Sequence, residues 1–287
     1  MTRPVLAAVD ASVRSRAAAH WAAQEAGRRE APLRLLHARP FLGRKANDLV
    51  ALDDLEAGAR SMLDEVAQEL TAAYPGLEVG SELVPDAAID GLVETAGQGQ
   101  LLVIGTRGLG GFHGLLVGSV SLGVAGRSTS PVVLVREGRP EPESHEPEVT
   151  VGFDALEPAD AVLEFAFEAA QLRGARVRVV HGWELPPVYG YAGWVPVETE
   201  RTELGSLAET MVAEAVAPWR EKYPRTLVLE DVRTGGGAAA LVEASAKSDL
   251  VVVGRRTRPM PLGTRLGGVT HAVIHHAQAP VAVVPHP

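Results

Sequence analysis

Short apolar runs alternate with longer amphipathic stretches along the first half of the chain. The runs are rich in aliphatic and β-branched residues and end at Gly, Pro or Asp, which is typical of buried strands. They predict strands at 5–9, 33–38, 77–84, 101–104 and 131–135. Apolar residues at helical spacing between them predict helices at about 13–26, 46–73, 86–93 and 119–127. This alternation indicates an α/β fold, a parallel sheet with helices on both faces, which binds ligands beyond the carboxyl ends of its strands.

The same pattern restarts after residue 148. Thr150–Asp154 repeats Leu6–Asp10 at an offset of 144 residues, and Leu250–Gly254 repeats Leu101–Gly105 at an offset of 149. The segment between the two copies is acidic, contains three prolines and has no apolar residue. We therefore predict two tandem domains, each with a five-stranded parallel sheet, at 1–137 and 148–287, joined by a linker at 138–147.

Composition narrows the classes of function. The 287 residues are 46% hydrophobic and 22% charged, as in an ordinary globular protein with a core. A net charge of −9 argues against binding to nucleic acid, which needs a basic surface. The absence of cysteine removes disulfides, thiolate metal sites and cysteine nucleophiles together. The first apolar run stops at Asp10, too early for a signal peptide, and no run approaches the roughly 18 apolar residues of a membrane helix, so we expect a cytoplasmic protein with no membrane partner.

A glycine-rich loop follows the strand at 101–104. Glycines at 105, 108 and 118 lead to Ser119 at the start of a predicted helix. Glycine lets the backbone approach a ligand closely, and a helix N-terminus presents unpaired N–H groups to anions. The loop therefore suits a phosphate cradle, although an ordinary surface loop explains it as well. Arg107 within it is either a charge partner for phosphates or a surface arginine.

Asp10 follows the first strand and would lie at the same edge of the sheet as this loop. Its carboxylate could accept a hydrogen bond from a nucleotide hydroxyl or help to hold Mg²⁺. It could equally cap the first helix, as Asp and Ser commonly do.

The three glycines and Ser119 spell G-x2-G-x9-G-S. Together with Asp10, this pattern resembles that of the universal stress protein family, whose ATP-binding members carry it. Further matching segments lie at His20–Ala22, Leu35–Ala38 and His275–Val284, so the resemblance covers both halves. It implies two tandem Rossmann-like domains of the adenine nucleotide α-hydrolase-like kind, ATP as the ligand, and a regulatory role in the stress response.

The resemblance also implies a set of nucleotide contacts in the first half. The residues that would border adenine and ribose are Ala8, Asp10 and Ala38. Those that would hold the ribose and the phosphates are Gly105, Arg107, Gly108, Gly118, Ser119 and Val120. The N–H groups of Gly118, Ser119 and Val120 and the Ser119 hydroxyl can donate to phosphate oxygens.

The second half departs from the pattern at two places. Thr257 replaces the second glycine and narrows the loop, and Gly268 replaces the serine. Loss of that hydroxyl removes one hydrogen bond to phosphate, worth roughly 0.5–1.5 kcal/mol. The candidate positions of this half are Gly152, Asp154, Gly182, Gly254, Arg256, Gly267, Gly268 and Val269. We predict that this second site binds nucleotide more weakly or stays empty.

Other phosphate-binding and metal-binding motifs fit less well. A P-loop needs a Gly-Lys pair, and none occurs. A dinucleotide fingerprint should follow the first strand, whereas the nearest match begins at Gly108 after the fourth and is one residue too long. A phosphoacceptor domain would need an Asp after strand three and a Lys after strand five, where the chain has Val84-Pro85 and Val135-Arg136. The nine histidines include no i, i+4 pair with a nearby Glu, which favours packing or surface roles over a metal site.

We therefore expect a nucleotide-binding regulatory protein with no catalytic residues, and not an enzyme. The alternative is a slow ATPase or another adenine-nucleotide enzyme. Hydrolysis would need a general base beside the loop, and His113 is the one candidate within it.

Two features of the sequence indicate where the chain could contact other domains or proteins: its apolar edge strands and one long segment. The fifth strands, at 131–135 and 280–284, are apolar, so we expect the two halves to pack as a pseudo-dimer, with a homodimer as a further option. The segment 183–197, with Tyr189, Tyr191 and Trp194, either contacts an unknown protein partner or folds over its own domain.

Overall fold

The computed structural model describes residues 2–38, 52–85, 87–106, 117–138, 146–184, 198–257 and 266–287. The chain splits into two compact units, Met1–Pro140 (unit 1) and Glu141–Pro287 (unit 2). Most of the predicted linker, 139–145, lies outside the described residues.

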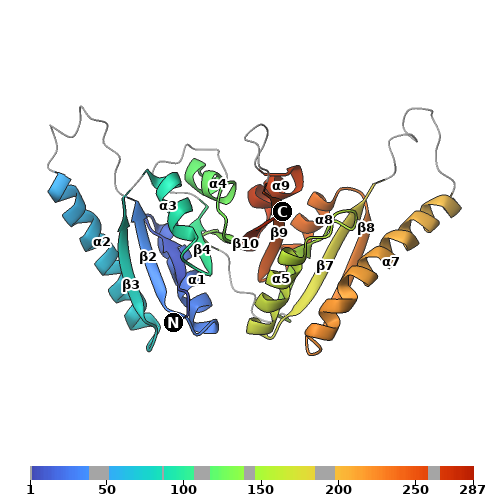
Figure 1. Ribbon diagram of the computed structural model, residues 1–287, viewed down its shortest axis with the longest axis horizontal. Helices are drawn as coiled ribbons and strands as arrows, with labels where there is room; N and C mark the ends of the chain where they lie inside the picture. Colours follow the sequence, from blue (N-terminus) through green and yellow to red (C-terminus); the bar gives the residue numbers. More distant parts are fainter. Residues whose placement is uncertain are drawn as a thin grey trace. The chain divides into compact units, whose positions relative to one another are not determined.

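Unit 1 alternates strand and helix along its described residues, as the hydrophobic pattern predicts (Figure 1). Its elements are β1 (Val5–Ala8), α1 (Val13–Arg28), β2 (Leu33–Ala38), α2 (Leu52–Ala73), β3 (Val79–Val84), α3 (Ala88–Ala96), β4 (Leu101–Gly105), α4 (Ser119–Ala125) and β5 (Val132–Val135). Neighbouring strands all pair in parallel, in the order β3-β2-β1-β4-β5.

Unit 2 repeats this architecture. Its elements are β6 (Glu148–Gly152), α5 (Asp160–Arg173), β7 (Arg176–Trp183), α7 (Glu198–Lys222), β8 (Val228–Thr234), α8 (Gly237–Ala244), β9 (Leu250–Arg256), α9 (Gly268–His276) and β10 (Val281–His286). The strands again pair in parallel, in the corresponding order β8-β7-β6-β9-β10. The predicted fold class, two tandem Rossmann-like units with five-stranded parallel sheets, is confirmed.

Burial explains the parallel arrangement. The strands β1, β4 and β5 are buried along their whole length, which requires helices on both faces of the sheet. Helix α1 packs against β1 and β4, and α2 packs against β2 and β3. In unit 2, α5 packs against β6 and carries Phe167, a fully buried side chain. No helix in the described part of the chain is long and apolar enough to cross a membrane.

Some elements begin later than predicted, for local reasons. The strand expected from Leu77 begins at Val79, because the Leu77 N–H bonds within the turn that ends α2. The helix expected from residue 86 begins at Ala88, because Ala87 keeps an extended backbone with ψ of 142°. Residues 46–51 of the long predicted helix lie outside the described residues.

Candidate functional site

The strand order of unit 1 reverses between β1 and β4. The chain leaves β1 for β2 on one side and β4 for β5 on the other, while β1 and β4 pair directly, with Ala8 opposite Ile104. In open parallel sheets, ligands bind at the carboxyl ends of the strands that flank such a reversal. The structure thus brings Ala8, Asp10 and Gly105 to the edge where a ligand is expected.

Asp10 lies in a hydrogen-bonded turn between β1 and α1. Its Oδ1 accepts from the Ser12 N–H at 3.2 Å and from the Ser12 hydroxyl at 2.6 Å. Ser12 is itself the N-cap of α1, because its Oγ accepts from the Ser15 N–H at 3.1 Å. Helix capping, one of the roles open to Asp10, therefore belongs to Ser12, and Asp10 orients the capping residue.

The turn is strained at Ala11. This residue has φ of 63°, in the left-handed region. That region is unfavourable for any residue with a Cβ, and such strain is common at functional sites.

Gly105 ends β4 against the first turn of α1. A Cβ at this position would lie 3.0 Å from the Arg14 carbonyl oxygen. The glycine is therefore required for helix packing, in addition to any room it leaves for a ligand. Its carbonyl oxygen accepts from the Ser121 hydroxyl at 2.8 Å, which fixes α4 to the end of β4.

The N-terminus of α4 supplies fewer donors than the sequence suggests. The Gly118 N–H donates to the Thr106 carbonyl oxygen at 2.6 Å, so in this conformation it is engaged within the chain. Ser119 and Val120 occupy the first turn, whose N–H groups have no intrahelical acceptor. Ser119 is exposed and Val120 is half-buried, so both remain able to face an anion.

Two predicted residues, Arg107 and Gly108, lie outside the described residues together with His113. Ala38 closes β2, the neighbour of β1, and is half-buried. The adjacent His37 is a residue whose local role the sequence did not indicate. Its Nδ1 lies 2.6 Å from the Val9 carbonyl oxygen. Because a carbonyl only accepts, Nδ1 carries the proton, and this bond ties the ends of β1 and β2 together.

Arg14 is a second residue that sequence reasoning missed at this edge. It lies in the first turn of α1, where a cation opposes the helix dipole. Its Nε lies 3.4 Å from Glu137 Oε2, with both side chains 41% exposed. An arginine two residues after a capping serine is a weak signal, because surface arginines are common.

Unit 2 keeps a turn like the one at Asp10 but lacks the serine that caps the following helix. Helix α5 begins at Asp160, and its N-cap, Ala159, makes no side-chain hydrogen bond. Asp154, the counterpart of Asp10, is exposed and accepts from the Leu156 N–H at 3.0 Å in a local turn.

The end of β7 is closed by the start of α8. Gly182, the counterpart of Ala38, packs so tightly there that a Cβ would lie 2.4 Å from the Gly237 nitrogen. Gly152 at the end of β6 likewise faces Leu241, whose Cδ1 would be 2.8 Å from a Cβ. These glycines are explained by packing within unit 2.

The end of β9 is covered by side chains of unit 2 itself. A Cβ at Gly254 would lie 2.9 Å from the His286 Nε2. Arg256, the counterpart of Arg107, forms an ion pair with Glu157. Burial lowers the pKa of His286, and the nearby Arg256 lowers it further, so the ring is neutral at about pH 7.

The remaining positions of the second motif lie directly after β9 and at the start of α9. Thr257, in place of a glycine, donates through its N–H and its hydroxyl to the His286 carbonyl oxygen, at 2.7 and 3.0 Å. Gly267 and Gly268 border open space, and Val269 is 43% exposed.

The described residues contain no cluster of three or more His, Asp or Glu side chains that could hold a metal ion. The histidines His271 and His275 stand one turn apart on α9, with ring centroids 4.4 Å apart. Within the described part of the chain they have no third ligand.

Comparison with known proteins assigns the class. The universal stress protein family model matches the chain twice, over residues 1–136 and 147–285. Universal stress protein Rv2005c of Mycobacterium tuberculosis is 32% identical over 97% of this chain and 96% of its own. A universal stress protein structure from Archaeoglobus fulgidus covers 100% of both chains with a TM-score of 0.66 at 19% identity. A universal stress protein in complex with cAMP is 30% identical over 46% of this chain and 96% of its own, with a TM-score of 0.38.

The chain therefore belongs to the universal stress protein family, as a tandem member with one family domain in each half.

Proposed function

We propose that unit 1 binds ATP at the carboxyl ends of β1 and β4. The observation that carries the proposal is the contrast between the two units at this place. In unit 1, Asp10 holds the capping residue Ser12 through two hydrogen bonds, and Ser119 at the start of α4 is exposed. In unit 2 the equivalent edge is filled by the Glu157–Arg256 ion pair and by His286 against Gly254.

The proposed roles of the unit 1 residues are those that the resemblance to ATP-binding family members implies. Ala8 and Ala38 border the adenine, and Asp10 accepts from a ribose hydroxyl or helps to hold Mg²⁺. The N–H groups of Ser119 and Val120 and the Ser119 hydroxyl donate to the phosphates. The loop positions Gly105, Arg107, Gly108 and Gly118 complete this proposed set, with Arg107 as the charge partner.

We infer that the protein acts through nucleotide-dependent binding to a protein partner in the cytoplasm and not through catalysis. Each ionisable side chain that the structure describes at this edge has a structural partner. Asp10 bonds to Ser12, Glu137 pairs with Arg14, and His37 bonds to the Val9 carbonyl. Measured ATP turnover within the usual range of about 1–10³ per second would overturn this inference and favour the ATPase alternative.

Calorimetric titration of the full chain with ATP and Mg²⁺ tests the site. We expect one ATP per chain. Ser119→Gly removes a hydroxyl that donates to a charged oxygen and should weaken binding about tenfold. The reciprocal change Gly268→Ser is the matched control and should leave the stoichiometry at one, because residues of unit 2 itself pack against the ends of β7 and β9. Two equivalent ATP per chain, or none, would refute the proposal.

The assembly is a separate proposal. The apolar strands β5 and β10 are suited to edge pairing, so we propose that the two units form a pseudo-dimer and that the chain forms a homodimer. Light scattering of the full chain should give the mass of a dimer, and the mass of a single chain would contradict the homodimer.

A further inference from the structure

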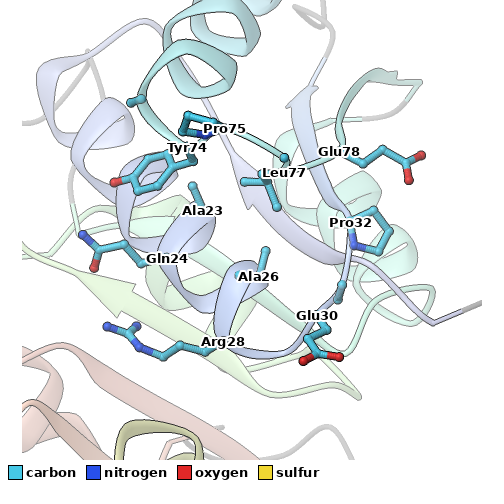
Figure 2. A pocket seen from close by; sticks show the side chains of 14 residues that line it. Ala23, Gln24, Ala26, Arg28, Glu30, Pro32, Tyr74, Pro75, Leu77 and Glu78 are labelled. Carbon is cyan, nitrogen blue, oxygen red and sulfur yellow. The ribbon is translucent and has the colours of Figure 1, made fainter.

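A concavity of unit 1 lies at the opposite end of the sheet from the candidate nucleotide edge and does not suit a phosphate (Figure 2). It borders the starts of β2 and β3, and the exposed carboxylates of Glu30 and Glu78 line it. Arg28, which also lines it, lies 3.7 Å from the carboxylate of Glu25. A cation for the proposed nucleotide therefore has to be sought at the carboxyl ends of the strands.

Arg14 supplies a positive charge at those ends. It lies in the first turn of α1, and its backbone contacts the end of β4, because a Cβ at Gly105 would lie 3.0 Å from the Arg14 carbonyl oxygen. Its Nε lies 3.4 Å from Oε2 of Glu137, two residues after the end of β5. The side chain of Arg14 thus reaches from the end of β4 to the segment that follows β5.

The proposed phosphate position adjoins the same two strand ends. The Thr106 N–H donates to the Val135 carbonyl oxygen of β5 at 2.9 Å, and the Thr106 carbonyl oxygen accepts from the Gly118 N–H at 2.6 Å. These two hydrogen bonds hold the start of α4, with Ser119, beside the ends of β4 and β5. Arg14 and Ser119 therefore flank the same pair of strand ends.

The pair of Arg14 and Glu137 occurs in unit 1 and not in unit 2. At the offsets of 144 and 149 residues, unit 2 has Pro158 and His286 in their places. His286 lies over the end of β9, since its Nε2 would be 2.9 Å from a Cβ at Gly254. The half of the chain with the eroded ATP motif thus also lacks this ion pair.

A cation at the position of Arg14 is unfavourable for α1 alone, because the N-terminus of a helix carries partial positive charge. One exposed ion pair stabilises a protein by little, so Glu137 is a weak reason for an arginine there. Residues that contradict the local preference of their element are expected at functional sites. An anionic ligand at these strand ends would give the arginine a second partner.

We propose that Arg14 exchanges its partner when nucleotide binds, from the Glu137 carboxylate to the polyphosphate of ATP. This inference rests on the proposed function of unit 1. A guanidinium binds carboxylate and phosphate oxygens with the same fork of N–H donors, so either anion suits it. Both side chains are 41% exposed, so the exchange requires no unpacking of the core.

The exchange makes the affinity depend on the charge of the nucleotide. Arg14 attracts ATP more strongly than AMP, because ATP brings more negative charge to the same strand ends. Glu137 opposes ATP, because its carboxylate competes for Arg14 and repels the phosphates. The two members of the ion pair therefore have opposite effects on ATP binding.

Calorimetric titration of the full chain with ATP, and with AMP in competition with ATP, tests the proposal. Arg14→Gln should weaken ATP binding about fivefold and AMP binding less than about twofold, and Arg14→Lys should restore most of the ATP affinity. Glu137→Gln should strengthen ATP binding about two- to five-fold. Arg34→Gln is the matched control and should change neither affinity. It breaks an ion pair with Glu82 of equal length and nearly equal exposure, 3.4 Å and 40%, near the amino ends of the strands.

The direction of the two effects separates this inference from a structural ion pair. A structural pair is lost in either variant, so weaker ATP binding in both Arg14→Gln and Glu137→Gln would overturn the inference. ATP binding by Arg14→Gln equal to that of the unchanged protein would overturn it too, and would leave ATP binding by unit 1 standing. An unchanged protein that binds no ATP would refute the proposed function itself.

Discussion

Replacing Glu148 by Gln tests how a buried ion network stabilises unit 2. Glu148 is 1% exposed at the start of β6. Its carboxylate accepts from Arg176 Nε at 2.8 Å and from Arg178 Nε and Nη2 at 2.9 and 3.0 Å. Arg178 also lies 3.3 Å from Asp231 on β8, so the network spans three strands.

The magnitude follows from burial. Removing one partner of a buried ion pair costs about 3–5 kcal/mol, because the other charge is left uncompensated. Arg176 and Arg178 are 25% and 23% exposed and keep their ion pairs with Glu146 and Asp231, so we expect a loss at the lower end of this range, about 3 kcal/mol.

The duplication supplies a matched control. Arg34 on β2 and Glu82 on β3 are the counterparts of Arg178 and Asp231; they lie 3.4 Å apart and each is 40% exposed. Glu148 itself has no counterpart, because unit 1 has Pro4 at that position. Glu82→Gln should therefore cost less than about 1 kcal/mol. The chain has four tryptophans, Trp21 in unit 1 and Trp183, Trp194 and Trp219 in unit 2. Variants that keep Trp21 alone or Trp219 alone therefore report on each unit in urea unfolding. Equal losses in the two variants would refute the reasoning.

The same network predicts a pH dependence. Burial alone would raise the pKa of Glu148, but hydrogen bonds from Arg178 and Arg176 outweigh it and hold the pKa below its usual value of 4.5. A carboxylate whose pKa is lower in the folded state stabilises the protein above its unfolded pKa, and this stabilisation is lost as the pH falls through the folded pKa. The advantage of the unchanged protein over Glu148→Gln should thus be complete at about pH 6 and shrink below about pH 4.5.

Three further substitutions and one ligand addition test other parts of the structure. Ala11 and Glu30 have φ of 63° and 49°, so Ala11→Gly and Glu30→Gly remove left-handed strain and should each raise the free energy of unfolding by about 0.5 kcal/mol. The gain is smaller than the strain itself, because glycine also increases the conformational entropy of the unfolded chain. A drop in Tm for both variants would contradict this. Phe167 stacks on Trp219 and Tyr223, so Phe167→Ala should destabilise unit 2 by about 3–5 kcal/mol in urea unfolding followed by Trp219 emission. A loss below about 1 kcal/mol would contradict tight packing of these three rings. ATP at about 100 times its Kd should raise the stability of unit 1 by about 2.7 kcal/mol in melts followed by Trp21, while an unchanged transition would argue against a site there.

The fold could be predicted largely because its signals are local and occur twice. The apolar run at Leu101–Gly105 reads as a buried strand by itself, and its repetition at Leu250–Gly254 checks that interpretation at a fixed spacing. Element ends were less predictable, because they depend on backbone geometry such as the extended Ala87 before α3.

The candidate site could be predicted only in part. Asp10 and Gly105 were placed at one edge because the carboxyl ends of parallel strands lie together. The spacing of glycines, however, records neither that the Gly118 N–H is taken by a carbonyl nor that Gly105 packs on α1. Closure of the second site by Gly237 against Gly182 is likewise a tertiary contact that no local pattern reports.

The anchor of the glycine-rich segment is the same in both halves. Ser121 Oγ donates to the Gly105 carbonyl oxygen at 2.8 Å, and Thr270 Oγ1 donates to the Gly254 carbonyl oxygen at 2.7 Å, each across sixteen residues. The two segments therefore have equal length and are held at their ends by equivalent hydroxyl-to-carbonyl hydrogen bonds. Exchange of 106–120 for 255–269 would move the loop chemistry from one half to the other and would replace only the last two residues of one strand, β9. A duplicated fold of this kind can therefore change one loop while the rest of its sheets stays the same.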